Sequence, residues 1–275
     1  MKKIAGKLIL YIFLTVLTVI TLAPILWVLI SSLKTKNEML TKPWSLPGKL
    51  MWTNYEQAWQ RGNFQVLLKN SVTITFFALI FMVTLSAMVA FAISRYKIRL
   101  SRITLIYLLI GQAISTAMIV FPIVIILKKI GFDDSHTGLI LTYIAGGLPF
   151  ATFVMQGFFN GIPKEIYEAA EIDGAGEFSI FRSIALPLAK PSLATVLLYQ
   201  FMWVWNEFTL SFTVINSTDK RTIIVGLYSV INGQLQTNYV LAFAGAVIVS
   251  LPIILIYLIF QKYLIQGLVD GSVKG

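Results

Sequence analysis

The chain contains no cysteine among its 275 residues, and its single histidine is His136. Without cysteine there is no disulfide, no thiolate metal ligand and no cysteine nucleophile. One imidazole also leaves little for acid–base catalysis. Charged residues make up only 12% of the chain, whereas a soluble domain carries roughly a quarter. Because apolar residues make up 57%, these shortages predict an integral membrane protein rather than an enzyme.

Stretches with little or no charge predict where the chain crosses the membrane. A bilayer core is about 30 Å thick, so a spanning helix needs roughly 20 apolar residues. An all-α, polytopic protein with six transmembrane helices is predicted, over residues 8–33, 70–94, 103–127, 137–163, 191–218 and 239–261. The first of these segments is too long for the apolar region of a signal peptide and is not followed by an A-x-A cleavage pattern, so we expect an uncleaved transmembrane helix. The apolar segment 222–231 is too short to span and is expected to be interfacial or re-entrant.

The distribution of basic residues predicts the orientation of the chain. Arg95, Lys97, Arg99 and Arg102 crowd into one short loop, and basic residues concentrate on the cytoplasmic side of membrane proteins. We therefore expect both termini to be cytoplasmic. The net charge of +10 comes from basic residues at the ends of the predicted spans, where they fix the topology and contact anionic lipid. No nucleic-acid partner is therefore expected.

Two groups of residues inside the predicted spans are unusual. Gly146 and Gly147 precede Leu148-Pro149, and such a run allows either close helix approach or a broken helix beside a cavity. In the fifth span, Glu207 follows Trp203, Trp205 and Asn206. A carboxylate at this depth is either a buried structural group or part of a solute pathway. The tryptophans could stack on sugar faces or form an interfacial belt.

The segment between the fourth and fifth spans is the most informative part of the chain. A short helix over 163–176 is predicted, because Pro163 suits a first helical position and Gly174 suits a C-terminal stop. Ala169 and Ala170 leave a low surface that a partner's groove could accept, and acidic neighbours could pair with basic residues there. The alternative is an amphipathic helix that packs on its own protein, and physical reasoning alone favours it.

The residues of this segment resemble a known motif. The run Glu168-Ala169-Ala170-x-x-Asp173-Gly174-Ala175, followed by Leu186-Pro187-Leu188 and Pro191, is similar to the EAA motif of binding-protein-dependent ABC importer permeases. Further resemblance to the carbohydrate branch, and to the smaller permease subunit of maltose-type importers, comes from Asn54-Tyr55, Asn70-Ser71, residues 205–208 and the ending 271–275.

The resemblance implies a type I ABC importer transmembrane domain and a permease subunit for a sugar or oligosaccharide. The implied division is an N-terminal helix and outer loop over 1–69, a core over 70–264 with the coupling loop at 161–190, and a cytoplasmic tail over 265–275. The location implied is a bacterial-type cytoplasmic (inner) membrane. The residues implied to contact an ATPase are Glu168, Ala169, Ala170, Glu171, Asp173 and Gly174. A second ATPase contact through residues 271–275 is a weaker expectation.

The same resemblance implies the partners. They are a homologous second permease subunit, two cytoplasmic ATPase subunits and an extracellular or periplasmic solute-binding protein. ATP and magnesium would be bound by the ATPase, because this chain has no G-x-x-x-x-G-K-[ST] sequence. No cofactor and no catalytic residue are expected in this chain. Trp203, Trp205, Asn206, Glu207, Gly146 and Gly147 are the predicted substrate-pathway residues.

Three alternatives stay open at this point. The first is an ABC permease for another class of solute. The second is an ion-coupled secondary transporter, which needs a coupling site at the membrane midplane, where Glu207 is the available carboxylate. The third is a membrane-embedded enzyme. His136 with Asp133 and Asp134 could bind a metal, but an exposed loop cluster of this kind is expected to be solvated, and no metal site is predicted.

Overall fold

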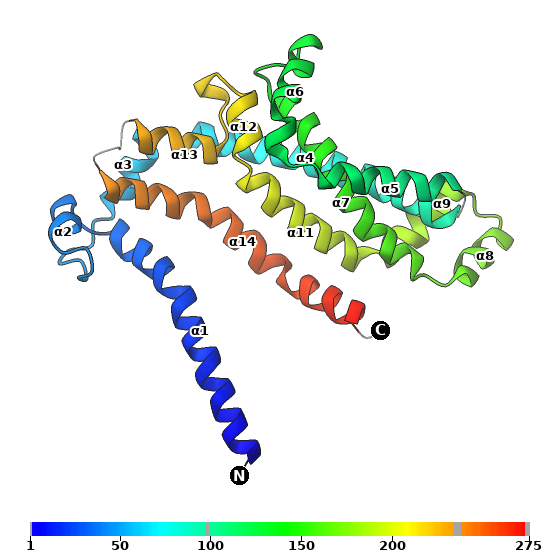
Figure 1. Cartoon of the computed structure of the whole chain (residues 1–275), viewed down its shortest axis with the longest axis horizontal. Coiled ribbons are helices and arrows are strands. Elements are labelled where there is room, and N and C mark those ends of the chain that lie inside the picture. Colours follow the sequence, from blue (N-terminus) through cyan, green and yellow to red (C-terminus); the bar gives the residue numbers. More distant parts are fainter. Residues whose placement is uncertain (1, 97–98, 234–237, 273–275) are drawn as a thin grey trace. The chain divides into compact units, whose positions relative to one another are not determined.

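The structure is a computed structural model that describes residues 2–96, 99–233 and 238–272. Every regular element in these ranges is helical (Figure 1). The first elements along the chain are α1 (Lys2–Ser32), α2 (Lys36–Thr41), α3 (Thr53–Arg61), α4 (Phe64–Arg95), α5 (Arg99–Ala113), α6 (Thr116–Lys129) and α7 (His136–Asn160). They are followed by α8 (Lys164–Ile172), α9 (Glu177–Ile180), the π-helix η1 (Phe181–Ala185), α10 (Leu186–Leu188), α11 (Lys190–Asn206), α12 (Thr209–Val214), the 3₁₀ helix η2 (Thr218–Lys220), α13 (Ile223–Asn232) and α14 (Tyr239–Ser272).

The helices that are long and apolar enough to cross a membrane agree with the predicted fold class. Four of them, in the described residues, are Gly6–Ser32, Phe64–Arg95, His136–Asn160 and Tyr239–Lys262, and two further bent pairs bring the number to six if each pair is one span. The all-α, polytopic membrane class is therefore confirmed. The segment predicted to be interfacial or re-entrant forms α13, a ten-residue apolar helix.

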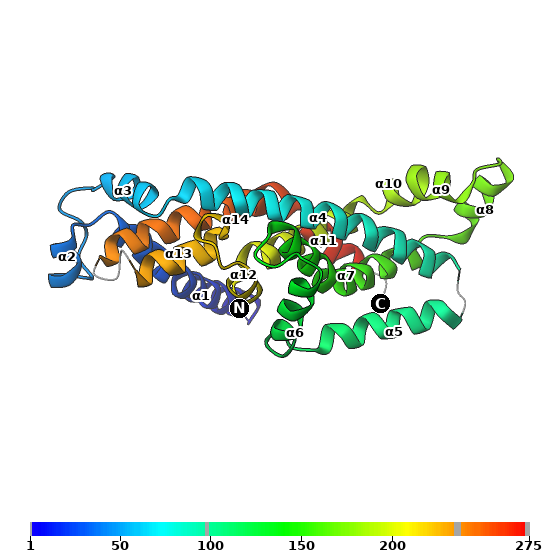
Figure 2. The ribbon, with the colours of Figure 1, turned by 90° about the horizontal axis from the view of Figure 1, so that it is seen from above.

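The third predicted span, 103–127, is not one straight helix. Ile103–Ala113 and Thr116–Lys129 meet at an angle of 103°, and Figure 2 shows α5 and α6 turning sharply where they join. Ser115 has extended backbone angles (φ −62°, ψ 135°) at this point. Pro122 lies inside α6 and does not cause the break. The prediction of a continuous helix was wrong here, because an extended serine divides it.

The fifth predicted span, 191–218, also ends early. α11 stops at Asn206, and Glu207 adopts extended angles (φ −70°, ψ 120°) before α12 begins. The bent pair that includes α11 instead reaches back to Glu177–Leu188, at an angle of 76°. The continuous helix through Glu207 was therefore wrong, since the chain turns at this residue.

The chain divides into two compact units, Met1–Gln65 with Gly226–Leu251, and Val66–Val225 with Pro252–Gly275. Residues 226–251 thus group with the N-terminal residues, and the division into 1–69, 70–264 and 265–275 stays a prediction. α14 continues to Ser272, so the predicted tail begins as helix. Residues 273–275 of that tail lie outside the described residues.

In the first unit, polar groups fold the segment after α1 back on itself. Lys34 is fully buried, and its ammonium donates to the carbonyls of Lys42 (3.3 Å) and Pro43 (2.7 Å). Asn54 Nδ2 donates to the carbonyls of Ser32 (2.8 Å) and Lys34 (2.9 Å). These bonds satisfy groups that are costly to bury unpaired, so Asn54 has a structural role.

The second unit has two apolar cores, both of which include residues of α4 and α7. One contains the aromatic residues Phe91, Phe159, Tyr167 and Phe181, near the C-terminal end of α7. The other contains Met82 and Tyr143, together with residues of α6, α11 and α12. Because α7 has 25 residues, its ends are about 37 Å apart, a little more than a bilayer core.

Candidate functional site

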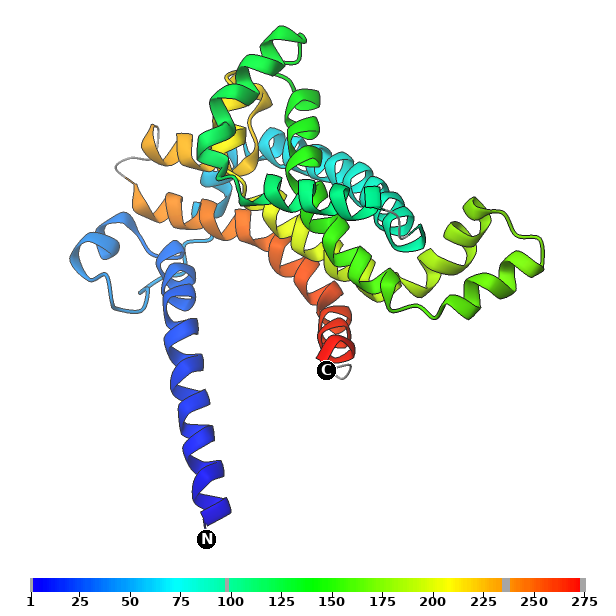
Figure 3. The same ribbon diagram turned by 45° about the vertical axis from the view of Figure 1, so that its right-hand side comes forward.

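The loop of residues 161–190, called the coupling loop below, turns back after α8 (Figure 3). α8 begins after Pro163, whose φ is −55°, and Gly174 follows it with φ +80°. This left-handed conformation favours glycine, since it has no Cβ. The observed helix lies within the predicted range 163–176, and Gly174 ends it as predicted.

The six residues predicted to contact an ATPase do not share one environment. The exposed members of the set are Glu168, Ala169, Glu171, Asp173 and Gly174. Ala170 is buried (8% exposed) in the aromatic core of its own chain. α8 therefore packs on its own protein, as the alternative interpretation required, and still leaves an exposed face with Glu168 and Ala169.

Arg95, at the C-terminal end of α4, binds the coupling loop and was not among the predicted site residues. Its guanidinium forms an ion pair with Glu171, and its Nε lies 3.4 Å from Oε1 of Glu177. It also lies over the ring of Tyr167, 5.4 Å from the ring centroid. Burial raises the pKa of Tyr167, and the charge of Arg95 partly opposes this rise. The sequence shows the basic end of α4 and the acidic loop, but not that they meet.

A cavity of about 510 Å³ lies in the second unit. The α5–α6 bend, α7, α11 and the first turn of α12 supply its walls, with lining residues that include Gln112, Thr116, Thr142, Gly146, Gly147, Tyr199, Gln200 and Trp203. Its lining, all within the described residues, contains no charged side chain. Gln112, Tyr199 and Gln200 were not predicted, because their approach depends on how the helices pack.

Of the two roles that the sequence left open for Gly146 and Gly147, the structure shows close helix approach and no break in the helix. α7 runs unbroken through Pro149. A Cβ on Gly147 would lie 2.4 Å from Sδ of Met82, and Gln200 Nε2 donates to the Gly147 carbonyl at 2.8 Å. A Cβ on Gly146 would lie 3.0 Å from the Trp203 ring. The glycines therefore permit close helix approach and also line the cavity.

The residues of the predicted cluster around Glu207 lie in different environments. Trp203 lines the cavity and meets the ring of Tyr143 edge-on at 5.7 Å. Trp205 is buried and stacks on Phe201 at 5.4 Å. Asn206 is exposed and donates to the carbonyl of Met202 within its own helix. Within this group, the structure places Trp203 alone at the cavity.

Glu207 is occupied by hydrogen bonds from its own chain. Its Oε1 accepts from the backbone N–H of Leu210 at 2.8 Å, and its Oε2 accepts from the N–H of Ser211 at 3.0 Å. The Tyr143 hydroxyl donates to Oε2 at 3.1 Å. The carboxylate thus satisfies the first N–H groups of α12, which is a structural role.

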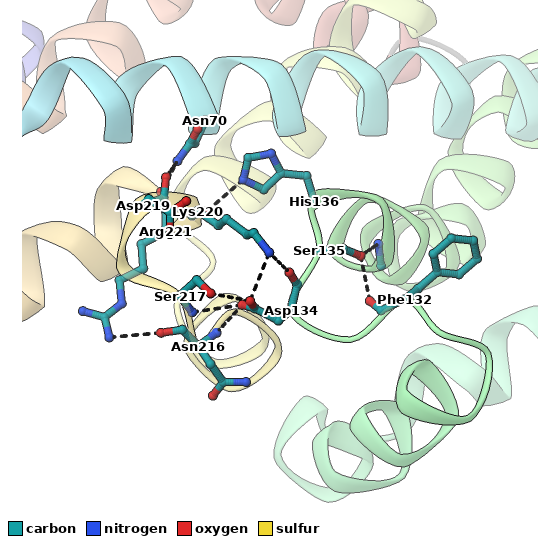
Figure 4. A network of polar contacts seen from close by, with 11 residues as sticks. Asn70, Phe132, Asp134, Ser135, His136, Asn216, Ser217, Asp219, Lys220 and Arg221 are labelled. Atoms are coloured by element: carbon teal, nitrogen blue, oxygen red, sulfur yellow. Dashed lines mark hydrogen bonds and ion pairs between the residues drawn. The ribbon is translucent and has the colours of Figure 1, made fainter.

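A second polar cluster lies at the N-terminal end of α7 (Figure 4). Oδ1 of Asp134 accepts from the backbone N–H groups of Asn216 (2.8 Å) and Ser217 (2.9 Å). Its Oδ2 accepts from the Ser217 hydroxyl and from Lys220 Nζ, the latter at 3.1 Å. Hydrogen bonds from Ser217, foremost that of its hydroxyl, hold the pKa of Asp134 well below its usual value.

This cluster joins α4 and α7 to the turn of residues 216–221. His136 Nε2 donates to the Lys220 carbonyl at 2.9 Å, and Asn70 Nδ2 donates to the carbonyls of Asp219 (2.7 Å) and Arg221 (3.1 Å). The expectation of a solvated loop cluster was therefore wrong for Asp134 and His136. In the described part of the chain, no three potential ligands among His, Cys, Asp and Glu gather around a metal site.

Comparisons with known proteins agree with this architecture. A family model described as "Binding-protein-dependent transport system inner membrane component" matches residues 82–270. The diacetylchitobiose uptake system permease protein NgcG of Streptomyces coelicolor is 34% identical over 94% of this chain and 85% of its own length. The maltodextrin transport system permease protein MdxG of Bacillus subtilis is 32% identical over 99% of this chain and 98% of its own.

Solved structures show the same fold at lower identity. A chain of a bacterial ABC transporter involved in import of the acidic polysaccharide alginate superposes with a TM-score of 0.81. It is 24% identical and covers 95% of this chain and 96% of its own. A chain of the MetNI methionine ABC transporter gives a TM-score of 0.60 at 16% identity, over 74% of this chain and 97% of its own.

Proposed function

We propose that this chain, which belongs to the family of binding-protein-dependent transport system inner membrane components, is a permease subunit of an ATP-driven saccharide importer. The coupling loop is the observation that carries the proposal. It presents a short helix with exposed Glu168 and Ala169, packed against the C-terminal ends of the apolar helices α4 and α7. This chain has no G-x-x-x-x-G-K-[ST] sequence, and an exposed helix of this kind offers a contact through which a separate ATPase can supply the energy.

The ATPase contact is proposed for the exposed face of α8 and the turn that follows it. Glu168 and Ala169 provide a carboxylate beside a low surface, and Asp173 with Gly174 forms the exposed end of the helix. Ala170 supports this surface from beneath, and Glu171 fixes its direction through Arg95. A second contact through residues 271–275 is retained as a proposal.

The proposed solute is an uncharged saccharide, and the cavity supports this choice. Gln112 and Thr116 supply hydrogen-bonding groups, and Tyr199 and Trp203 supply aromatic surface that can stack on the apolar face of a sugar. Two relatives are named for uptake of diacetylchitobiose and transport of maltodextrin. The lining has no cation for the carboxylate of an acidic saccharide. Since this chain supplies one side of a pathway, a homologous permease subunit is proposed to complete it.

The remaining partners follow from the same proposal. Two cytoplasmic ATPase subunits bind ATP and magnesium, and an extracellular or periplasmic binding protein delivers the solute. The chain is a multi-pass membrane protein. We place it in a bacterial-type cytoplasmic (inner) membrane with both termini and the coupling loop in the cytoplasm. The Asp134 cluster then lies on the outer side. No catalytic residue is assigned to this chain.

Purification from its native membrane in mild detergent tests the assembly. We expect an ATPase and a second permease-like protein to co-purify in stoichiometric amounts, and a ligand screen of the associated binding protein to identify the saccharide. Recovery of the chain alone, from membranes that support uptake, would contradict the proposal. An ion-coupled transporter or a membrane-embedded enzyme would become the better interpretation.

A further inference from the structure

Arg95 connects one long apolar helix to two separate helices of the coupling loop. Its side chain is 16% exposed, compared with 45% for Glu171 and 43% for Glu177. Glu171 lies in α8 and Glu177 begins α9. The more deeply buried cation thus lies between carboxylates from both sides of the turn, where screening by solvent is weaker than at a fully exposed pair.

The geometry requires arginine rather than any cation. A guanidinium is planar and offers five donors in a fixed fork, so it can reach two carboxylates and stack over a ring at the same time. Here it makes all three contacts, and its Cζ lies over the Tyr167 ring, 5.4 Å from the ring centroid. Lysine would keep the charge but would present one compact ammonium, and could not reproduce the three contacts together.

One turn earlier on α4, Phe91 makes the apolar half of the same connection. Its ring lies 5.9 Å from Phe159, 6.0 Å from Tyr167 and 5.3 Å from Phe181. These rings belong to α7, α8 and η1. The last two turns of α4 therefore hold the coupling loop by an aromatic contact and an ionic contact side by side.

α4 also forms part of the packing at the cavity. Met82, 13 positions before Arg95 in the same helix, lies against Gly147, which lines the cavity. That separation is about 20 Å along a helix. A helix is stiff over this length, so a displacement applied at Arg95 reaches the packing behind the cavity wall.

We propose that Arg95 is a positioning residue that makes α8 and α4 move as one body. A displacement of α8 is thereby passed through α4 to the Met82–Gly147 contact at the cavity. This inference rests on the proposed function, because it assumes that a partner ATPase displaces α8. It goes beyond that proposal by assigning the connection to one side chain.

The first test measures solute transported per ATP hydrolysed in the reconstituted complex of permeases, ATPase and binding protein. Loss of the ionic contacts in Arg95→Ala should lower this ratio by about tenfold, which corresponds to the lower end of the range for one hydrogen bond to a charged group. Arg95→Lys should give an intermediate value. Arg182→Ala is the matched control, because Arg182 is an exposed arginine of the same loop.

An unchanged ratio in Arg95→Ala would overturn the inference, and so would an equal loss in Arg182→Ala, which would indicate a general effect of charge. Recovery of the complex in detergent is measured for each variant, so that a failure to assemble is recognised. If the unmodified complex shows no ATP-driven uptake, the proposed function itself fails. If it transports normally and Arg95→Ala matches it, the inference alone fails.

The second test measures the proposed movement directly and needs no transport. Because the chain has no cysteine, spin labels can be placed on cysteines introduced at Met88 and Lys164, both exposed, on α4 and α8. We expect one narrow distance distribution that stays the same with and without ATP in the assembled complex. In Arg95→Ala the distribution should broaden. A distance that changes with ATP while Arg95 is intact would overturn the inference.

Discussion

Replacement of Glu207 distinguishes a structural carboxylate from one that contacts the transported solute. The change to alanine removes acceptors from the N–H groups of Leu210 and Ser211 and from the Tyr143 hydroxyl. Tyr143 and Ser211 are fully buried and Leu210 is 3% exposed, so water cannot easily replace all three bonds. Each buried donor left unpaired costs about 1–3 kcal/mol.

The expected loss of stability in Glu207→Ala is therefore about 3 kcal/mol, the lower end of the sum, because Glu207 itself is only half-buried. For a chain of this size, that loss corresponds to a melting temperature lower by about 6–12 °C. Glu207→Gln keeps the shape and one acceptor oxygen, which in the Oε2 position still accepts from the Ser211 N–H and the Tyr143 hydroxyl, so the Leu210 N–H alone loses its acceptor. It should lose only about 1 kcal/mol, the value of one hydrogen bond.

The assay is thermal unfolding of the purified complex in detergent, with uptake per folded complex measured in parallel. Asn206→Ala is the control, because the neighbouring Asn206 is exposed and bonds only within its own helix turn; we expect little change in either measurement. The reasoning would be refuted if Glu207→Gln abolished uptake while its melting temperature stayed normal. That outcome would return Glu207 to the solute pathway.

Three further changes test other parts of the structure. Gly147→Val should destabilise the complex by about 1–3 kcal/mol and reduce uptake, because a Cβ there would lie 2.4 Å from the Met82 sulfur; normal thermal unfolding would contradict this close approach. The pKa of Asp134 is lowered by Ser217, so its stabilising effect is present above the ordinary aspartate value of about 3.9 and is lost as pH falls below it. Stability measured against pH should therefore fall more steeply below about pH 4 in the unmodified protein than in Asp134→Asn, and parallel curves would count against the cluster. Gly174→Val places a β-branched residue at φ +80°, which costs about 1–2 kcal/mol; it should leave the protein in the membrane but reduce ATP-driven uptake, and full uptake would argue against a role for this turn.

Much of the architecture could be predicted from the sequence because lipid imposes strong constraints on composition. A charge-free stretch long enough to span a bilayer has few stable structures other than a transmembrane helix. The ranges beginning near residues 8, 70, 137 and 239 accordingly correspond to long helices. The helix of the coupling loop could also be predicted, because Pro163 precedes its first residue and Gly174 follows its end.

The breaks in the other two spans depend on contacts that a one-dimensional pattern does not contain. The turn at Glu207 exists because its carboxylate satisfies the start of α12 and meets Tyr143, 64 positions earlier. The bend after α5 occurs at Ser115, within a stretch that is apolar on both sides. In both cases tertiary hydrogen bonding or local backbone geometry prevails over continuous hydrophobicity.

The helix of the candidate site was predicted, but its contacts with the rest of the chain were not. The motif identified α8, but the burial of Ala170 and the exposure of Ala169 depend on which face meets the aromatic core. Arg95 was interpreted only as a determinant of orientation, because the Glu171 that it binds lies 76 positions away in the sequence. Charge complementarity between a basic helix end and an acidic loop is the signal that would have suggested the pair.

Uptake into liposomes that contain the purified complex tests the central claim most directly. With the binding protein outside and ATP inside, the account predicts saccharide accumulation that stops without ATP and is unaffected by a protonophore. Accumulation that continues without ATP and collapses with the protonophore would contradict the account and show an ion-coupled transporter.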